Sequence, residues 1–168
     1  MPILYTLVGL PASGKSTFCK SHPECVYVSS DAIRKELYGD EATQGNASDV
    51  FAIAHERIDH YLTLGYNVIF DATNTTRKSR KQALAHKAYH IAVYFDIPVS
   101  VCKARNAKRD RVVPDFVYDN MIKYMSNPTK YEGFNDVLVV HEYQIMLNTL
   151  DTVLTVWYNS SIERMCAI

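Results

Sequence analysis

The stretch Gly9-Leu10-Pro11-Ala12-Ser13-Gly14-Lys15-Ser16-Thr17 decides the fold of this chain, because it fills the pattern GxxxxGK(S/T) of a phosphate-binding loop. Its glycines let the backbone curl so that consecutive N–H groups point at an anionic polyphosphate. We expect Lys15 to reach the β and γ phosphates of ATP or another nucleoside triphosphate, and Ser16 to bind the bridging Mg²⁺. The predicted nucleotide-binding residues of the loop are Gly9, Ala12, Ser13, Gly14, Lys15, Ser16 and Thr17.

The residues around this loop have the context that the motif requires. A short run of apolar and β-forming residues, 3–8, precedes the loop and predicts a buried strand. A helix is expected to begin at Lys15 and to direct its partially positive N-terminus at the same anion. The alternative, a glycine turn with a chance lysine, does not explain this strand–loop–helix context.

Strand and helix patterns alternate along the rest of the chain, which favours a parallel sheet flanked by helices. The predicted fold is therefore an α/β P-loop NTPase domain with a five-stranded parallel sheet and an arginine-bearing helical lid. The expected strands after the first are 25–29, 67–71, 90–95 and 137–140, and the expected helices are 15–22, 32–38, 47–64, 77–89, one from Pro98 through the cation-rich run, and 114–125.

Composition places the chain among globular proteins of one domain. It has 168 residues, of which 48% are hydrophobic and 21% are charged, and its formal net charge is +0. We expect a kinase core over about 3–140, whereas 141–168 fits neither helix nor strand period cleanly. No apolar run approaches the roughly 20 residues of a membrane span, and no basic leader precedes Val8, so we expect a cytoplasmic protein.

Cysteine spacing and net charge exclude further classes. Cys19, Cys25, Cys102 and Cys166 lack the spacing of a zinc site or a disulfide framework and are expected to be buried free thiols. A neutral protein is not expected to follow long duplexes, so any nucleic-acid contact should be local or limited to strand ends.

A carboxylate and an arginine stand at the second strand-to-helix junction. Asp31 follows the strand 25–29, and in open parallel sheets sites gather at the carboxyl ends of strands. Asp31 should therefore lie near the phosphate-binding loop, and Arg34, three residues later, should face the same way. The alternative is a helix cap with a surface salt bridge.

The third strand ends in a second polar group, Asp71-Ala72-Thr73-Asn74. Asp71 occupies the place of a Walker B carboxylate, which could hold Mg²⁺ through water or fix a neighbouring arginine. We expect Asp71, Thr73 and Asn74 to contact substrate, unless they only satisfy the backbone groups of a turn.

Two basic stretches follow. Between Cys102 and Arg111 we expect one helix that places Arg105 and Arg109 a turn apart on the same face, as a lid over the nucleotide. The alternative there is a surface helix with snorkelling cations. The cluster 77–81 is typical of a solvated face, with a nucleic-acid role as the alternative.

The segment around His55 and His60 resembles a zinc-protease helix only superficially. The two histidines are five residues apart, about 140° around a helix, so they should not share a metal. We interpret both as ordinary helix positions.

Four stretches together, GLPASGKST, SSDAIRKELYG, VIFDATN and CKARNAKRDRVVP, resemble the kinase domain of the polynucleotide 5′-hydroxyl kinases, within the zeta-toxin-like group of small P-loop kinases. The resemblance covers about 3–140. It implies that Asp31 is the general base toward the 5′-hydroxyl and that Arg34 holds a phosphate of the acceptor strand. It further implies that Arg105 and Arg109 belong to a lid over the donor phosphates.

The residues agree with these implied roles. A hydroxyl attacks efficiently only when a carboxylate such as Asp31 accepts its proton, and the planar guanidinium of Arg34 binds phosphate in bidentate fashion. The resemblance implies a phosphatase or ligase domain in many such kinases, and we expect none within these 168 residues, so end repair is expected to use separate enzymes.

The leading hypothesis is an ATP- and Mg²⁺-dependent kinase of 5′-hydroxyl ends of DNA or RNA. We expect Lys15, Asp31 and Arg109 to be catalytic, and Ser16 to hold Mg²⁺ with Asp31 or Asp71. The alternatives are a kinase of a small hydroxyl compound, such as a nucleoside or nucleotide sugar, and a nucleotide-binding module without transfer. Donor preference and oligomeric state do not follow from the sequence.

Overall fold

A computed structural model shows a five-stranded sheet in the order β2-β3-β1-β4-β5, in which every neighbouring pair is parallel. It describes residues 1–40, 43 and 45–142, so Cys166 and most of the segment 141–168 lie outside the described residues. The strands are β1 Ile3–Val8, β2 Val26–Ser29, β3 Val68–Asp71, β4 Tyr89–Asp96 and β5 Asp136–His141. The α/β P-loop fold and its five parallel strands are thus confirmed.

Side chains alternate between the two faces of the sheet and build two cores. Val68 and Phe70 of β3 pack with α3 in one core, whereas Ile69 between them belongs to the other. The α-helices are α1 Lys15–Lys20, α2 Ser30–Tyr38, α3 Ala47–Thr63, α4 Arg77–Ala83, α5 Val99–Asn106 and α6 Asp115–Tyr124, and a 3₁₀ turn, η1, spans Lys130–Glu132.

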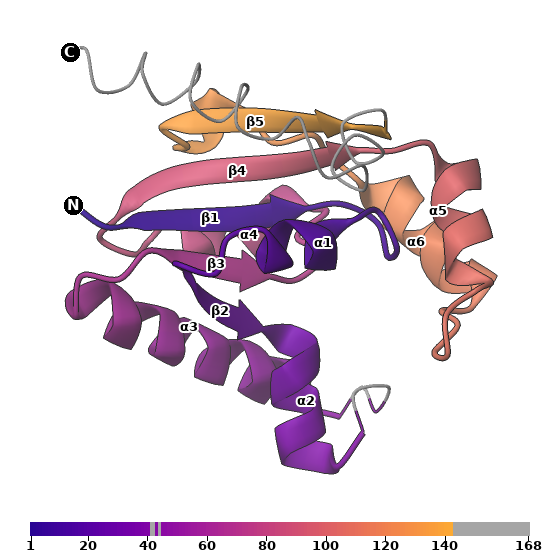
Figure 1. The fold of residues 1–168 in the computed structure, drawn as a ribbon, viewed down its shortest axis with the longest axis horizontal. Coiled ribbons are helices and arrows are strands. Elements are labelled where there is room, and N and C mark those ends of the chain that lie inside the picture. The colour runs from indigo at the N-terminus through magenta and orange to yellow at the C-terminus, as the bar shows by residue number, and fades with distance from the viewer. Residues whose placement is uncertain (41–42, 44, 143–168) are drawn as a thin grey trace.

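All strands point toward the same end of the molecule, and α5 and α6 lie beyond that end (Figure 1). The register pairs Ser29 of β2 with Asp71 of β3, so these two strands end side by side. The loop after β1, the central strand, opens between them and β4. This geometry gathers every strand-to-helix junction of interest on one edge of the sheet.

Several predicted helix boundaries were wrong. The helix that begins at Lys15 ends at Lys20 instead of His22. The helix after Asp71 ends at Ala83 instead of about Tyr89. α5 ends at Asn106, because its side-chain amide binds both the N–H and the carbonyl of Val113 (3.0 and 2.8 Å) and turns the chain back. Arg105 and Arg109 therefore do not share a helix. Pro114 is the N-cap of α6 instead of its first residue.

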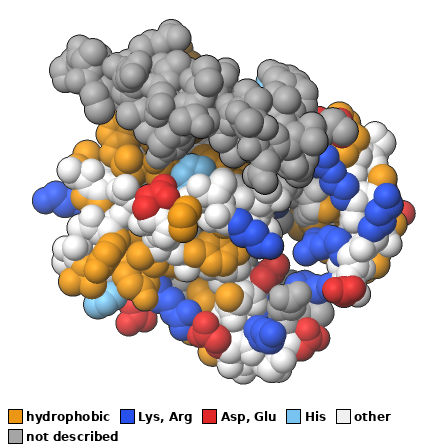
Figure 2. All heavy atoms as spheres, viewed as in Figure 1, with side chains coloured by type: hydrophobic (Ala, Val, Ile, Leu, Met, Phe, Trp, Pro, Cys, Tyr) orange, Lys and Arg blue, Asp and Glu red, His pale blue; other side chains and the backbone are white. Residues whose placement is uncertain are grey.

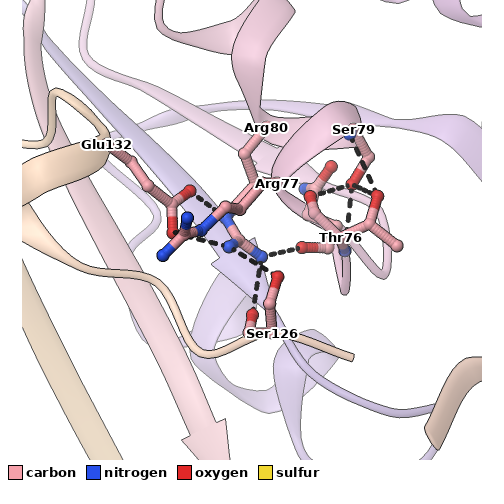
Figure 3. A network of polar contacts seen from close by, with 7 residues as sticks. Thr76, Arg77, Ser79, Arg80, Ser126 and Glu132 are labelled. Atoms are coloured by element: carbon pink, nitrogen blue, oxygen red, sulfur yellow. Dashed lines mark hydrogen bonds and ion pairs between the residues drawn. The ribbon is translucent and has the colours of Figure 1, made fainter. Parts of the chain in front are cut away.

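A buried arginine, Arg80, joins the turn after β3 to the chain that follows α6 (Figure 3). Arg80 of α4 is 0% exposed and pairs with Glu132 through two hydrogen bonds of 2.8 Å. It also donates to the carbonyls of Asn74 and Ser126 (both 2.9 Å) and to the Ser126 hydroxyl (3.2 Å). The cluster 77–81 is thus split, because Arg80 is structural while Arg77, Lys78 and Lys81 are exposed.

The two histidines of α3 lie in different environments. His55 is buried, and its Nδ1 lies 2.8 Å from Nε2 of His86, whose Nδ1 lies 2.5 Å from Asp59. Burial lowers the pKa of His55 to about 4. His60 is exposed, and in the described part of the chain no cluster of three or more ligand-type side chains could hold a metal ion.

Within the described residues, Cys19, Cys25 and Cys102 are free thiols, but of the three only Cys102 is buried, and the expected burial of Cys19 and Cys25 was wrong. None of the described helices is both long and apolar enough to span a membrane.

Candidate active site

A cavity of about 1040 Å³ opens at the carboxyl ends of the strands. On the face shown in Figure 2, Lys and Arg side chains gather around a hollow on the side of α5 and α6. The cavity wall contains residues from the phosphate-binding loop, from the junctions after β2 and β3, and from the segment between α5 and α6. Its charged members are Lys15, Asp31, Arg34, Asp71, Arg105, Arg109 and Arg111.

The phosphate-binding loop holds an uncommon backbone conformation. Ala12 has φ 59° and Gly14 has φ 106°, both in the left-handed region. A Cβ at Gly9 would lie 2.8 Å from the Ser13 hydroxyl and 2.9 Å from Cβ of Phe95, so only glycine fits there. The Gly9 N–H donates to the Thr73 carbonyl (3.0 Å) and ties the loop to the end of β3.

Lys15 is buried within its own loop. Its Nζ donates to the carbonyls of Gly9 (3.0 Å) and Leu10 (2.7 Å). Burial lowers its pKa, and the Asp71 carboxylate opposes that shift. No side chain caps the N-terminus of α1, and the buried Ser13 hydroxyl has no partner among the described residues. The loop therefore keeps polar groups available for a ligand.

Asp31 and Arg34 meet as the sequence predicted. Ser29 caps α2, so Asp31 stands in the first turn of that helix. Arg34 Nη1 donates to Asp31 Oδ1 at 2.7 Å, and Arg111 Nη1 lies 3.7 Å from Oδ2. The Asp31 side chain is 52% exposed and that of Arg34 only 12%. A carboxylate open to the cavity is thus held by a nearly buried guanidinium.

Asp71 lines the same cavity from the end of β3. Burial raises its pKa, while the Tyr27 hydrogen bond and the nearby Lys15 oppose that shift. The Tyr27 hydroxyl donates to Asp71 Oδ2 at 2.6 Å. Thr73 also lines the cavity, but the buried Asn74 does not, because its amide donates to the Leu7 carbonyl (2.9 Å) and its φ is 45°. Asn74 shapes the turn that presents its neighbours.

The segment between α5 and α6 completes the cavity. Arg105 lies 3.6 Å from Glu142, and the Arg109 side chain has no hydrogen-bond or ion-pair partner within the described ranges. Tyr118 of α6 donates to the carbonyl of Pro11 (2.9 Å), which holds this helix against the phosphate-binding loop. Arg105 and Arg109 therefore reach one cavity although they do not share a helix.

Sequence reasoning did not assign Tyr27, Arg111 or the apolar part of the cavity wall, Val112 and Phe116, to the site. Phe116 and Val112 line the cavity while 65% and 55% exposed. In the sequence, the signal for this apolar part of the wall was that Val112 and Phe116 flank Pro114 directly after a cation-rich run. Nothing local marks Tyr27, because its contact with Asp71 crosses from one strand to the next.

The charges of the wall fit a polyphosphate with its metal. Five cations face two carboxylates, a surplus of three positive charges. Ser16 is exposed at the cavity and Asp71 keeps one carboxylate oxygen without a hydrogen bond to the described residues, so both fit Mg²⁺. Mg²⁺ typically takes the rest of its six ligands from water and substrate phosphates, so a pre-formed protein cage is not needed.

Comparisons with known proteins agree with this arrangement. The family model AAA_33, described as an AAA domain, matches residues 4–128. L-seryl-tRNA(Sec) kinase of Methanococcus maripaludis is 24% identical over 184 residues, which cover 99% of this chain and 66% of that protein. The chain thus spans slightly less than two thirds of the length of this relative.

Two solved structures are similar at the level of the fold. A chain of the Pnkp1/Rnl/Hen1 RNA repair complex is 26% identical, with a TM-score of 0.61 over 73% of this chain and 43% of that one. A sugar kinase from Janibacter sp. HTCC2649 is 18% identical, with a TM-score of 0.67 over 89% and 93%. At that identity the sugar kinase shows the fold alone.

Proposed function

The chain belongs to the AAA_33 family of AAA domains, and we propose that it transfers the γ-phosphate of ATP to the 5′-hydroxyl end of a DNA or RNA strand. The observation that carries this proposal is the meeting of Lys15, the Asp31–Arg34 pair and the cation-rich turn in one cavity. A nucleotide-binding module without transfer would have no use for an exposed carboxylate beside the phosphate-binding loop.

The donor half of the site consists of the phosphate-binding loop and the turn after α5. Lys15 leaves the Gly9 and Leu10 carbonyls to bind the terminal phosphates, and Arg105 and Arg109 neutralise charge on the transferred group. Mg²⁺, held by Ser16 and through water by Asp71, would screen the phosphate charges when bound.

The acceptor half is formed by Asp31, Arg34 and Arg111. Asp31 accepts the proton of the attacking hydroxyl while a bond forms from its oxygen to the γ-phosphorus. The bond from that phosphorus to the β–γ bridging oxygen breaks, and ADP leaves. An acceptor phosphate competes for the guanidinium groups of Arg34 and Arg111, which releases the Asp31 oxygens that they now contact.

Two findings support a nucleic acid as the acceptor. The curated relative is a kinase of a charged tRNA, and the RNA repair complex contains a chain 26% identical to this one. The exposed Phe116 and Val112 also offer an apolar surface at the cavity on which a base can stack. The neutral net charge agrees with local contact at a strand end.

An acceptor panel tests the substrate class. The chain is incubated with γ-labelled ATP, Mg²⁺ and, separately, a 5′-hydroxyl oligonucleotide, a nucleoside, seryl-tRNA and a hexose. We expect label on the oligonucleotide. Label only on the nucleoside or hexose would establish the small-molecule alternative, and label only on seryl-tRNA would place the activity with that of the curated relative.

The Asp31–Arg34 pair gives a second test. Asp31→Asn should lower the turnover number by about 10²- to 10⁴-fold while ATP affinity stays nearly unchanged. Arg34→Ala should raise the acceptor KM by about tenfold or more. A large loss of ATP binding in Asp31→Asn would assign Asp31 to the metal, and an unchanged KM would remove Arg34 from the acceptor site.

A further inference from the structure

We infer that Tyr27 is a positioning residue for the Mg²⁺-binding carboxylate of Asp71, an inference that rests on the donor half of the proposed function. The Tyr27 hydroxyl donates to Asp71 Oδ2 at 2.6 Å, between two strands that are neighbours in the sheet but 44 residues apart in the chain.

The register of β2 and β3 explains how the two side chains meet. Tyr27 lies opposite Ile69, and Ser29 lies opposite Asp71. The Tyr27 ring therefore extends forward by two residues along the strand direction to reach the carboxylate. A shorter side chain at position 27 could not bridge this distance. Ser30 adds a second link, since its hydroxyl donates to the Asp71 carbonyl at 3.4 Å.

The hydrogen-bond donor to Asp71 is a neutral hydroxyl and not a cation, which matters for a carboxylate that is to bind Mg²⁺. Among the described residues no lysine, arginine or histidine forms an ion pair with Asp71, because Lys15 donates to loop carbonyls instead. Its carboxylate thus receives a neutral hydroxyl, which orients it without cancelling its charge. One hydroxyl proton occupies one oxygen, and Oδ1 keeps the freedom to bind a water of the Mg²⁺ shell.

Tyr27 belongs to neither hydrophobic core of the described residues, so core packing does not fix its conformation. Its side chain is on an edge strand, and the residue is 47% exposed. Its hydrogen bond to the cavity carboxylate is the contact that distinguishes it from an ordinary surface tyrosine.

The test is Tyr27→Phe, which removes only the hydroxyl. The affinity for ATP is measured by calorimetry across a range of Mg²⁺ concentrations and also in EDTA, without any acceptor. We expect the Mg²⁺ concentration needed for half-maximal tight binding to rise by about tenfold. Affinity in EDTA and the melting temperature should not change.

Tyr94→Phe is the matched control, because Tyr94 also donates to a carboxylate, Asp96 (3.3 Å), yet neither residue lines the cavity. It should leave the Mg²⁺ dependence unchanged. An unchanged dependence in Tyr27→Phe, or an equal loss of affinity in EDTA, would overturn the inference. Because no acceptor is present, a negative oligonucleotide assay would refute the proposed transfer reaction without affecting this result.

Discussion

Buried and cavity-lining arginines of this molecule differ in the hydrogen-bond and ion-pair partners of their guanidinium groups. Arg80 is 0% exposed and uses its guanidinium for five hydrogen bonds to Glu132, Asn74 and Ser126. Arg109, in the turn after α5, has no partner for its side chain within the described residues, and Arg111 lies 3.7 Å from Asp31. A buried charge must be paired, whereas the exposed charge of Arg109 beside the cavity is open to a ligand.

Arg80 and the arginines of the cavity are expected to serve different purposes, stability and phosphoryl transfer respectively. Arg80 binds Asn74 in the turn after β3 and Ser126 in the chain after α6, and none of these three residues lines the cavity. The arginines of the cavity lie on the wall itself. Loss of Arg80 should therefore act first on folding, and loss of a cavity arginine on phosphoryl transfer.

Among the arginines, the largest expected effect is that of Arg109→Ala on catalysis. We expect the turnover number to fall by about 10³-fold, because arginines that neutralise a transferring phosphoryl group contribute at least that much in other systems. The urea midpoint should stay at the wild-type value, since no contact in the described protein is lost. Lys108→Ala, at an exposed neighbouring position outside the cavity, is the control. A fall of similar size in Lys108→Ala would show that the whole turn, not Arg109, is at fault.

Arg80→Met should have the opposite profile. We expect a loss of about 3–5 kcal/mol in the free energy of unfolding, because Glu132 is left buried without its partner. Urea denaturation measures this loss, and the double variant Arg80→Met/Glu132→Leu should recover part of it. Lys78→Met, on the exposed side of the same helix, is the control. A loss below about 1 kcal/mol would mean that the buried pair contributes no more than a surface one.

Arg57→Ala is expected to have the smallest effect. Arg57 pairs with Glu36 at the surface, where both side chains are more than 40% exposed. Exposed pairs contribute about 0.2–1 kcal/mol, so both the unfolding free energy and the transfer rate should stay close to wild type. A loss of activity in this variant would contradict the division of arginines by burial and position.

Local patterns were sufficient for much of the fold and the candidate site. The phosphate-binding loop, Asp31 and Asp71 were found because each follows a predicted strand, and the carboxyl ends of parallel strands share one edge. The length of α5 was not predicted, since its end depends on the contact of Asn106 with Val113. A helical pattern of cations does not reveal a turn that a side-chain amide holds from seven residues away.

The sequence by itself determined the P-loop α/β class, the succession of strands and helices along the chain, and the residue types available for phosphoryl transfer. All three depend on motifs and periodicity. Only the tertiary structure decided which arginines are structural and which face the cavity. Arg80 and Arg109 both come from basic runs, and no local rule separates them. Burial and hydrogen bonding depend on segments distant in sequence, such as Glu132 beside Arg80 and Tyr27 beside Asp71, and the fold alone brings these together.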